Sequence, residues 1–304
     1  MSTVDFDALY NALDAMTDCE VRQNVPMAQL TTFKIGGPAR IVVEPTNVVD
    51  VLMTLQQVNE AGAELRVVGC GSNILAADEG LDCVILHIGP DMSGIEIEGE
   101  VLYADAGATN GQVAAAAQAA GLAGYEFASG IPGTIGGAAY MNAGAYGSEF
   151  KDIVCNIVCI SREGAVFELE REEAGLGYRH SRMMDDESIV LGATLQLRKD
   201  DPAAIQERMD DLHARREEKQ PLEMPSAGST FKRPEGYFAG KLIQDAGLKG
   251  YRVGDAMVSE KHSGFIVNAG SATAAQVLQL IGDIQDKVFQ MEGVRMEPEV
   301  RIWR

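Results

Sequence analysis

Basic residues are scarce in this chain, and this scarcity excludes several classes of partner. The 304 residues include 25 Lys and Arg against 45 Asp and Glu, a formal charge of −20 at pH 7. Nucleic-acid binding needs a basic face that displaces counterions, and docking on anionic lipid also depends on basic residues. We therefore expect no nucleic-acid partner and no membrane partner. A small anionic ligand stays compatible with this charge, because a pocket can gather a few cations locally.

Cysteine, histidine and long apolar runs are also sparse. The five cysteines are an odd, scattered set, which is typical of reduced thiols in a cytoplasmic protein. Cys155 and Cys159 lie in a strand-like run, and the four histidines lack paired ligand spacing, so we expect no metal site. No apolar run reaches the ~18 residues that span a bilayer, and the first residues lack a basic signal-peptide start. A cytoplasmic location is the expectation, with no sign of an obligate protein partner.

The overall composition, 46% hydrophobic and 23% charged residues, is typical of a globular protein. At about 150 residues per domain, the length predicts two domains. Short β-rich runs alternate with helical patterns over 31–198, which predicts mixed α/β structure in two subdomains, 31–92 and 93–198. Residues 1–30 form an N-terminal segment. At residue 199 the composition becomes more charged, which predicts the start of a smaller α+β domain, 199–304. We expect the last strand of this domain to return to the active site.

One helix is predicted with both of its ends. Thr46 precedes a run in which Val48, Leu52 and Leu55 fall on one face, and the run stops at Gly62. We therefore expect a helix capped by Thr46 with that face buried.

Two more helices, a charged run and a loop complete the outline. Thr109 and Gly121 delimit an Ala-rich helix, and a long helix with a periodic apolar face ends before Gly293. The run Arg208–Lys219 reads as a solvated helix face, and 225–234 as a Gly/Ser/Pro loop.

Two glycine-rich loops are candidate phosphate sites, because glycine lets backbone N–H groups approach a phosphate closely. The loop Gly69-Cys70-Gly71-Ser72-Asn73-Ile74 lacks the third glycine of the Rossmann fingerprint, and the loop 130–137 has different spacing. No Walker A loop occurs. Two such loops in one α/β block favour a bound dinucleotide, although tight turns explain the spacing equally well.

Ordered motifs over most of the chain give a specific resemblance. The N-terminal half contains Thr31-Thr32-Phe33-Lys34-Ile35-Gly36-Gly37-Pro38-Ala39, Gly69-x-Gly71-Ser72-Asn73-x-Leu75, Gly130-Ile131-Pro132-Gly133-Thr134-Ile135-Gly136-Gly137 and Met141-Asn142-Ala143-Gly144-Ala145-Tyr146-Gly147. The C-terminal half contains Tyr178-Arg179-x-Ser181, Ala227-Gly228-Ser229-Thr230-Phe231-Lys232, Ala239-Gly240-Lys241-Leu242-Ile243, Ala246-Gly247-Leu248-Lys249-Gly250, His262-x-x-Phe265-Ile266-Val267-Asn268 and Glu299-Val300-Arg301. From about residue 22 onward the chain resembles the UDP-N-acetylenolpyruvoylglucosamine reductase family.

Two features qualify this resemblance. Cys70 stands where the family usually has a small residue, and the short stretch between Ser181 and Val190 lacks the Tyr-bearing substrate loop of one branch. The chain therefore resembles the branch without that loop.

The resemblance implies a fold, a reaction and a set of ligands. The fold would be an FAD-binding domain of the vanillyl-alcohol-oxidase type followed by the smaller α+β substrate domain. The reaction would reduce UDP-N-acetylglucosamine enolpyruvate to UDP-N-acetylmuramate for bacterial peptidoglycan, with FAD as cofactor and NADPH as reducing cosubstrate. The implied flavin-binding residues are Phe33, Lys34, Ile35, Gly36, Gly37, Gly69, Gly71, Ser72, Asn73, Leu75, Gly107, Gly130, Ile131, Pro132, Gly133, Gly136, Gly137 and Asn142. The implied residues for the sugar nucleotide are Tyr146, Tyr178, Lys219, Lys232, Asn268 and Arg301.

Three residues would carry the chemistry by the same resemblance. Arg179 would grip the substrate carboxylate, Glu299 would help to stabilise the enolate, and Ser229 would donate the proton. A serine hydroxyl is a weak acid in water, so this role needs a hydrogen-bond network and a neighbouring charge such as Lys232. Judged singly, each of these residues also fits a surface or turn position.

A serine acyltransferase or hydrolase is the alternative. Ser229 and Lys232 spell the S-x-x-K motif of penicillin-binding enzymes, but Ser148 and Lys151 spell it too. The companion motifs S-D-N and K-T-G do not occur.

The acidic composition makes a further prediction under the flavoenzyme hypothesis. An acidic protein that handles three anionic molecules needs its cations concentrated. We expect Arg179, Lys219, Lys232 and Arg301 to converge on one cleft.

Overall fold

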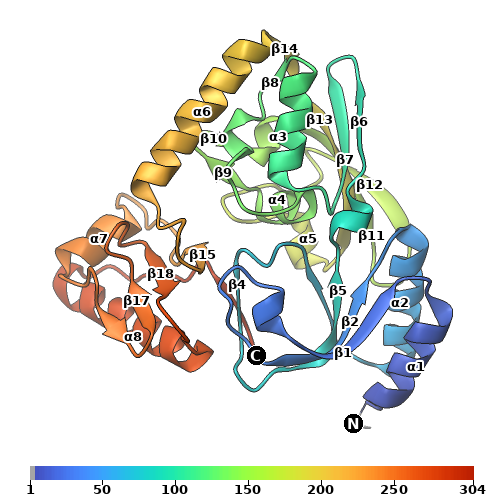
Figure 1. Cartoon of the computed structure of the whole chain (residues 1–304), viewed down its shortest axis with the longest axis horizontal. Coiled ribbons are helices and arrows are strands. Elements are labelled where there is room, and N and C mark those ends of the chain that lie inside the picture. The colour runs from blue at the N-terminus through green and yellow to red at the C-terminus, as the bar shows by residue number, and fades with distance from the viewer. Residues whose placement is uncertain (1–3) are drawn as a thin grey trace. The chain divides into compact units, whose positions relative to one another are not determined.

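The computed structural model describes residues 4–304, and these divide into two compact units (Figure 1). The first unit takes the chain up to Gln23, Ile41–Cys70 and Cys83–Arg215. The second takes Asn24–Arg40, Gly71–Asp82 and Arg216–Arg304. Residues 1–3 of the expected N-terminal segment lie outside the described residues. The second unit is therefore built from three stretches of chain rather than from the C-terminal stretch alone.

Two sheets form the framework of the first unit. The strands of the four-stranded sheet, in spatial order, are β1 (Glu20–Pro26), β2 (Pro38–Glu44), β5 (Leu81–His87) and β3 (Leu65–Val68). Those of the five-stranded sheet are β12 (Val166–Glu170), β11 (Val154–Ile160), β13 (Ile189–Gln196), β7 (Val101–Asp105) and β6 (Ile95–Glu98), all antiparallel. Short pairs join β8 (Leu122–Ala123) to β14 (Arg198–Lys199), and β9 (Gly144–Ala145) to β10 (Ser148–Glu149).

Helices pack on these sheets. The α-helices of the first unit are α1 (Phe6–Met16), α2 (Val48–Ala61), α3 (Asn110–Ala119), α4 (Ile135–Met141), α5 (Arg182–Asp185) and most of α6 (Pro202–Lys219). The 3-10 turns of the chain are η1 (Met27–Gln29), η2 (Pro90–Met92), η3 (Glu126–Ala128) and η4 (Phe150–Asp152). The helices α1 and α2 lie side by side, and α4 packs against β13 and β7 (Figure 1).

The central strands explain why this unit is stable. In β5 four successive residues, Cys83 to Leu86, are buried, as are Ile41 to Val43 in β2. Continuous apolar runs are typical of strands that are covered on both faces. The apolar core of this unit runs through both sheets and α2, α3 and α4.

The second unit has one antiparallel sheet backed by a long helix. The sheet order is β15 (Ser226–Ser229), β18 (Phe265–Asn268), β17 (Ala256–Val258) and β16 (Arg252–Val253). The helix α8 (Ala274–Glu292) packs against β16, β17 and α7 (Ala239–Asp245). A parallel pair joins β4 (Ile74–Ala76) to β19 (Arg301–Trp303). Phe33, Ile35 and Leu75 are buried in the core of this unit.

The predicted ends of α3 and α8 are confirmed. The side chain of Thr109 caps α3 in a capping box, and Gly121 follows the helix with φ +65°. Thr273 caps α8, which ends at Gly293 in the left-handed region. Cys155 and Cys159 lie in β11, as the strand-like pattern indicated.

The prediction for α2 is wrong in two details. Its cap is Asn47, whose Oδ1 accepts hydrogen bonds from the backbone N of residues 49 and 50. Val48 and Leu52 are exposed, and the buried face is formed by Val51, Leu55 and Val58.

Two other local predictions need correction. Residues 226–229 form β15 instead of a loop, because they pair with β18. The run 208–219 is not wholly solvated, since Arg216 is only 7% exposed and Arg208 pairs with two carboxylates. The compact units place most of α6 in the first unit and two early stretches in the second, and the domain ranges expected from the sequence stay a prediction.

Candidate functional site

Ser229 lies at the end of β15, where the pairing with β18 is irregular. The register shifts between Ser226 and Ser229, and Gly228 between them has φ +72°, a conformation that glycine adopts without strain. The next residue, Thr230, is buried, and its Oγ1 accepts a hydrogen bond from Ile266 N at 3.0 Å. The bulge therefore leaves Ser229 exposed while Thr230 anchors the strand end.

Glu299 reaches the same strand end from the C-terminal segment. Its backbone N donates to Thr230 O at 2.8 Å. The Asn73 amide Nδ2 donates to Glu299 O at 3.2 Å, and Asn73 O accepts from Arg301 N at 2.9 Å. Three segments that are distant in sequence thus meet here, and they bring Ser229, Glu299 and the loop 71–75 together.

The loops 33–37 and 71–75 are held tightly within the second unit. A Cβ at Gly71 would collide with Leu30 O, so only glycine allows this approach. Thr32 donates from its backbone N to Gly71 O and from Oγ1 to Ser226 O, at 3.3 and 2.7 Å. Thr32 therefore links both loops to β15, a role that its place in a sequence motif does not reveal. Lys34 is exposed at φ +55°.

Asn268 and Lys232 have partners inside the second unit. Asn268 is 6% exposed, and its Nδ2 donates to Phe33 O at 3.3 Å while its Oδ1 accepts from two backbone N–H groups. Lys232 Nζ lies 3.5 Å from Glu297 Oε2. Lys219 is exposed at the last residue of α6. Contact of these three side chains with a sugar nucleotide stays a prediction.

In the first unit, Arg179 lies in a two-residue turn. Gly177 and His180 exchange backbone hydrogen bonds of 3.0 and 3.3 Å, and Arg179 between them has φ +55°. Its guanidinium carbon lies 5.3 Å from the centre of the Tyr178 ring. Asn142 Nδ2 donates to Gly177 O at 2.8 Å. The unusual backbone of the turn is thus supported by a buried amide.

The same amide connects the turn to an ion pair. Asn142 also donates to Glu149 Oε2 at 3.0 Å and accepts from Lys151 N at 2.9 Å. Lys151 Nζ lies 2.7 Å from Glu149. The Lys151 hydrogen bond holds the pKa of Glu149 below its ordinary value against partial burial, and Asn142 and the Arg179 charge lower it further. Asn142 therefore uses both its side chain and its backbone N–H, which donates to Ala139 O at 3.2 Å, for contacts within the protein, and its flavin contact stays a prediction.

The glycines of the first unit serve two purposes. A Cβ at Gly69 would lie 2.5 Å from Thr134 Oγ1, and one at Gly107 would collide with Gly89 O, so both glycines permit internal packing. Gly137 at the start of α4 is exposed, and a Cβ there would meet nothing closer than 3.7 Å. The N–H groups of Ile135, Gly136 and Gly137 already donate to Ala108 O, Ala106 O and Thr134 Oγ1. What fits a flavin here is therefore the open space that the missing side chain of Gly137 leaves.

The expected site residues are divided between the two units. Those in the first unit are Gly69, Gly107, Gly130, Ile131, Pro132, Gly133, Gly136, Gly137, Asn142, Tyr146, Tyr178 and Arg179. Those in the second unit are Phe33, Lys34, Ile35, Gly36, Gly37, Gly71, Ser72, Asn73, Leu75, Lys219, Ser229, Lys232, Asn268, Glu299 and Arg301. Within each unit the structure groups part of the set, and the ligand role of each residue stays a prediction.

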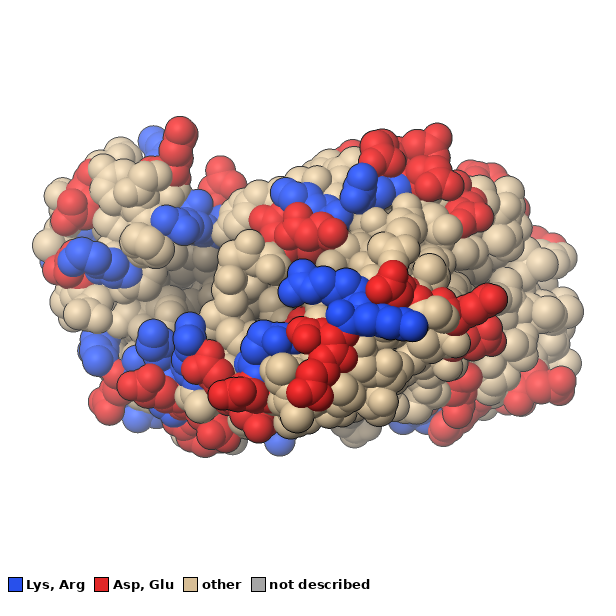
Figure 2. Space-filling view, turned by 90° about the horizontal axis from the view of Figure 1, so that it is seen from above, with Lys and Arg blue, Asp and Glu red and all other residues tan. Residues whose placement is uncertain are grey.

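Charged side chains of both signs are mixed on the surface. On the face shown in Figure 2, Lys and Arg lie beside Asp and Glu rather than in one broad basic patch. Of the four cations expected to converge, Arg179 belongs to the first unit and the other three to the second. Over residues 4–304 there is no cluster of three or more His, Cys, Asp or Glu suited to a metal ion. Within the same residues, none of the helices has the length and apolar character needed to cross a membrane.

Comparison with known families matches both parts of the chain. Residues 39–170 match a family described as an FAD binding domain. Residues 220–303 match the family described as UDP-N-acetylenolpyruvoylglucosamine reductase, C-terminal domain. The fold and these matches define an FAD-binding oxidoreductase with a second α+β domain.

Relatives of nearly the same length identify the family. The UDP-N-acetylenolpyruvoylglucosamine reductase of Agathobacter rectalis is 47% identical over 292 residues, which cover 92% of this chain and 93% of the relative. That of Limosilactobacillus fermentum is 44% identical over 292 residues, with coverages of 96% and 97%. The crystal structure of the Thermus caldophilus enzyme is 34% identical with a TM-score of 0.83, over 94% of this chain and 100% of that one. This chain belongs to the UDP-N-acetylenolpyruvoylglucosamine reductase family, which confirms the resemblance and the fold class drawn from the sequence.

Proposed function

We propose that this chain is the cytoplasmic UDP-N-acetylmuramate dehydrogenase of a bacterium. It reduces the enolpyruvyl ether of UDP-N-acetylglucosamine with NADPH, a step of peptidoglycan synthesis. The observation that carries the proposal is that Ser229 and Glu299 lie at one strand end, since Glu299 N donates at 2.8 Å to the O of Thr230, the residue after Ser229. The family match over almost the whole chain supports it.

The glycine loops would hold FAD, which when bound supplies the hydride-transfer chemistry of the reaction. The loops 33–37 and 71–75 of the second unit and the loop 130–137 of the first are the proposed flavin-binding segments, because they carry the family's motifs. Gly137 contributes open space, and the tight packing at Gly69 and Gly71 keeps the loop backbones in place. Rigid loops lower the cost of ordering the binding site.

The catalytic side chains act on the substrate carboxylate and the adjacent carbon. Arg179 would bind the carboxylate through two parallel N–H donors, because the planar fork of a guanidinium matches the two oxygens of a carboxylate. Glu299 would help to polarise the substrate carboxylate or relay the proton, since a carboxyl group can stabilise a developing enolate only while it carries a proton. Ser229 would donate the proton from its hydroxyl, held by a strand end that Thr230 fixes in place.

The first experiment is an absorbance spectrum of the purified protein with FAD. We expect flavin bands that bleach on anaerobic addition of NADPH and return on addition of UDP-N-acetylglucosamine enolpyruvate. A protein that takes up no FAD, or whose reduced flavin ignores the sugar nucleotide, contradicts the proposal.

A second experiment addresses the serine-enzyme alternative. In an S-x-x-K enzyme the lysine must face the serine, an arrangement that residues three apart adopt on a helix. Here Ser229 ends a strand, and Lys232 pairs with Glu297. We expect no covalent labelling by a β-lactam or a fluorophosphonate probe, whereas labelling at Ser229 would favour the hydrolase.

A further inference from the structure

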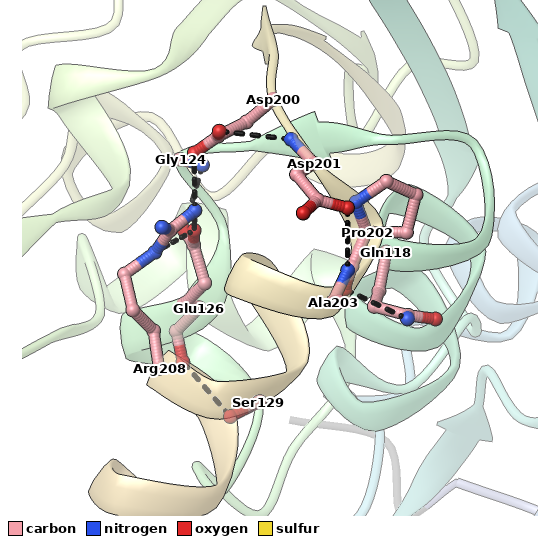
Figure 3. A network of polar contacts seen from close by, with 9 residues as sticks. All are labelled: Gln118, Gly124, Glu126, Ser129, Asp200, Asp201, Pro202, Ala203 and Arg208. Atoms are coloured by element: carbon pink, nitrogen blue, oxygen red, sulfur yellow. Dashed lines mark hydrogen bonds and ion pairs between the residues drawn. The ribbon is translucent and has the colours of Figure 1, made fainter.

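A buried carboxylate joins α6 to the segment that precedes the glycine loop 130–137 (Figure 3). Glu126, at the start of η3, is 9% exposed. Its Oε1 accepts from Arg208 Nε at 2.9 Å, and its Oε2 accepts from Gly124 N at 2.6 Å. Both carboxylate oxygens of Glu126 are therefore used, one by α6 and one by the backbone just before η3.

Arg208 holds a second carboxylate at the start of its own helix. Its Nη2 lies 2.6 Å from Asp200 Oδ2 and 2.8 Å from Glu126 Oε1. Asp200 also accepts from Asp201 N at 2.8 Å, and the carboxylate of Asp201 accepts from Ala203 N at 3.1 Å. Arg208 thus bridges the entry of α6 and the buried acid of η3, as the dashed lines in Figure 3 show.

From Glu126 the contacts lead directly into the loop. Ser129 donates from Oγ to Glu126 O at 2.8 Å, and Ile131 N donates to Ala128 O at 2.9 Å. The amide of Asn110 donates to Ile131 O at 3.2 Å. The first residues of the loop 130–137 are therefore held by η3, which is itself held by Arg208.

We propose that Arg208 is a positioning residue for the flavin loop and acts through Glu126. This inference rests on the proposed function, because it needs the loop 130–137 to bind FAD. Arg208 fixes η3 through Glu126, and η3 fixes Ile131 at the start of the loop, because Ile131 N donates to Ala128 O. Removal of the guanidinium leaves a buried carboxylate without its cation, so η3 shifts toward water and the loop loses its binding geometry.

The helix α6 also offers a matched control. Arg215 pairs with Asp211 four residues earlier, at 2.8 Å, and both side chains are more than half exposed. This pair lies wholly on α6, so Arg215→Met removes an arginine and an ion pair without reaching η3. Surface pairs of this kind contribute little to stability.

The test is the dissociation constant for FAD of the full-length protein, measured by flavin fluorescence without substrate. We expect Arg208→Met to weaken FAD binding by about two- to thirtyfold, the range of typical coupling through packed networks. Arg215→Met should bind FAD like the wild type. Arg208→Lys keeps a charge for Glu126 but has no fork to bridge two acids, so it should restore part of the affinity.

Two further variants separate positioning from general stability. Glu126→Gln should weaken FAD binding as Arg208→Met does. The double variant, with both Arg208→Met and Glu126→Gln, should bind FAD only slightly more weakly than either single variant. Asp200→Asn breaks the other half of the bridge and should leave the FAD affinity near wild type. Equal effects of Asp200→Asn and Glu126→Gln, or unchanged affinity in both Arg208 variants, overturn the inference. If the wild type binds no FAD, the proposed function fails instead.

Discussion

At the residue scale, Ser229 tests the proton-donor assignment. Substitution by alanine removes the hydroxyl at an exposed strand end without disturbing the buried anchor Thr230. We expect Ser229→Ala to slow reduction of the sugar nucleotide by roughly 10²- to 10⁴-fold, the usual contribution of a positioned acid. NADPH-driven flavin reduction, followed by stopped-flow absorbance, should be unchanged. Ser226→Ala on the same strand is the control, and equal loss of both half-reactions in Ser229→Ala contradicts the role.

The lowered pKa of Glu149 predicts how the stability of the protein changes in acid. This pKa is held below the ordinary 4.5, first by the Lys151 hydrogen bond. A lowered carboxyl pKa gives stability that is fully present above the unfolded value and disappears as the pH falls through the folded value. Urea unfolding should therefore show Glu149→Gln less stable than wild type at neutral pH, with the difference shrinking below pH 4.5. The role of the lowered Glu149 pKa is contradicted if the loss of stability in Glu149→Gln does not change with pH. It is also contradicted if exposed Glu98→Gln loses the same amount of stability.

At the scale of elements, α8 depends on a residue that is far away in sequence. Asp78, in the chain after β4, accepts hydrogen bonds from Ala274 N and Ala275 N at 2.7 and 2.9 Å. A carboxylate at a helix N-terminus satisfies free N–H groups and opposes the helix dipole. We expect Asp78→Ala to lower the free energy of unfolding by about 1 kcal/mol in urea titrations. The neighbouring exposed Glu79→Ala is the control, and equal unfolding midpoints for the two variants would refute the capping role.

Helix ends were predictable to within one residue, as the caps Thr46 (predicted) and Asn47 (observed) of α2 show, whereas helix faces and strand partners were not. Thr109 and Gly293 were found because caps are local signals. Two sets of apolar residues in α2 have helical spacing: the predicted face (48, 52, 55) and the observed buried face (51, 55, 58). Only the packing of the folded chain selects which of them is buried. The strand β15 escaped prediction because its Gly/Ser sequence reads as a turn and its partner β18 lies far along the chain.

The residues of the candidate site also fall into those that the sequence predicts and those that it does not. Motifs located Ser229, Glu299 and the glycine loops, since the residue types and their order are visible in the sequence. No sequence signal pointed to Asp78, Glu126 or Arg208, because their partners are set by tertiary contacts. Supporting residues of this kind become visible only when distant segments are placed together.

At the scale of the whole molecule, the charge of −20 has a measurable consequence. Like charges on a compact chain repel one another, and salt screens this repulsion within about 8 Å at physiological ionic strength. We expect the midpoint of thermal unfolding to rise as sodium chloride is added up to ~0.2 M. Choline chloride should give the same curve, because screening depends little on the cation. A steady fall in the midpoint would mean that local ion pairs outweigh the net repulsion.

The pairing of β19 with β4 bears on how the protein is made. The strand 301–303 lies parallel to residues 74–76, more than two hundred residues earlier in the chain, and donates from Arg301 N to Asn73 O. The edge at residues 74–76 must therefore wait, unpaired, through the synthesis of more than two hundred residues. The loop with Asn73 therefore reaches its final hydrogen bonds only when this long-range contact closes, which makes the contact a non-local and slow step of folding.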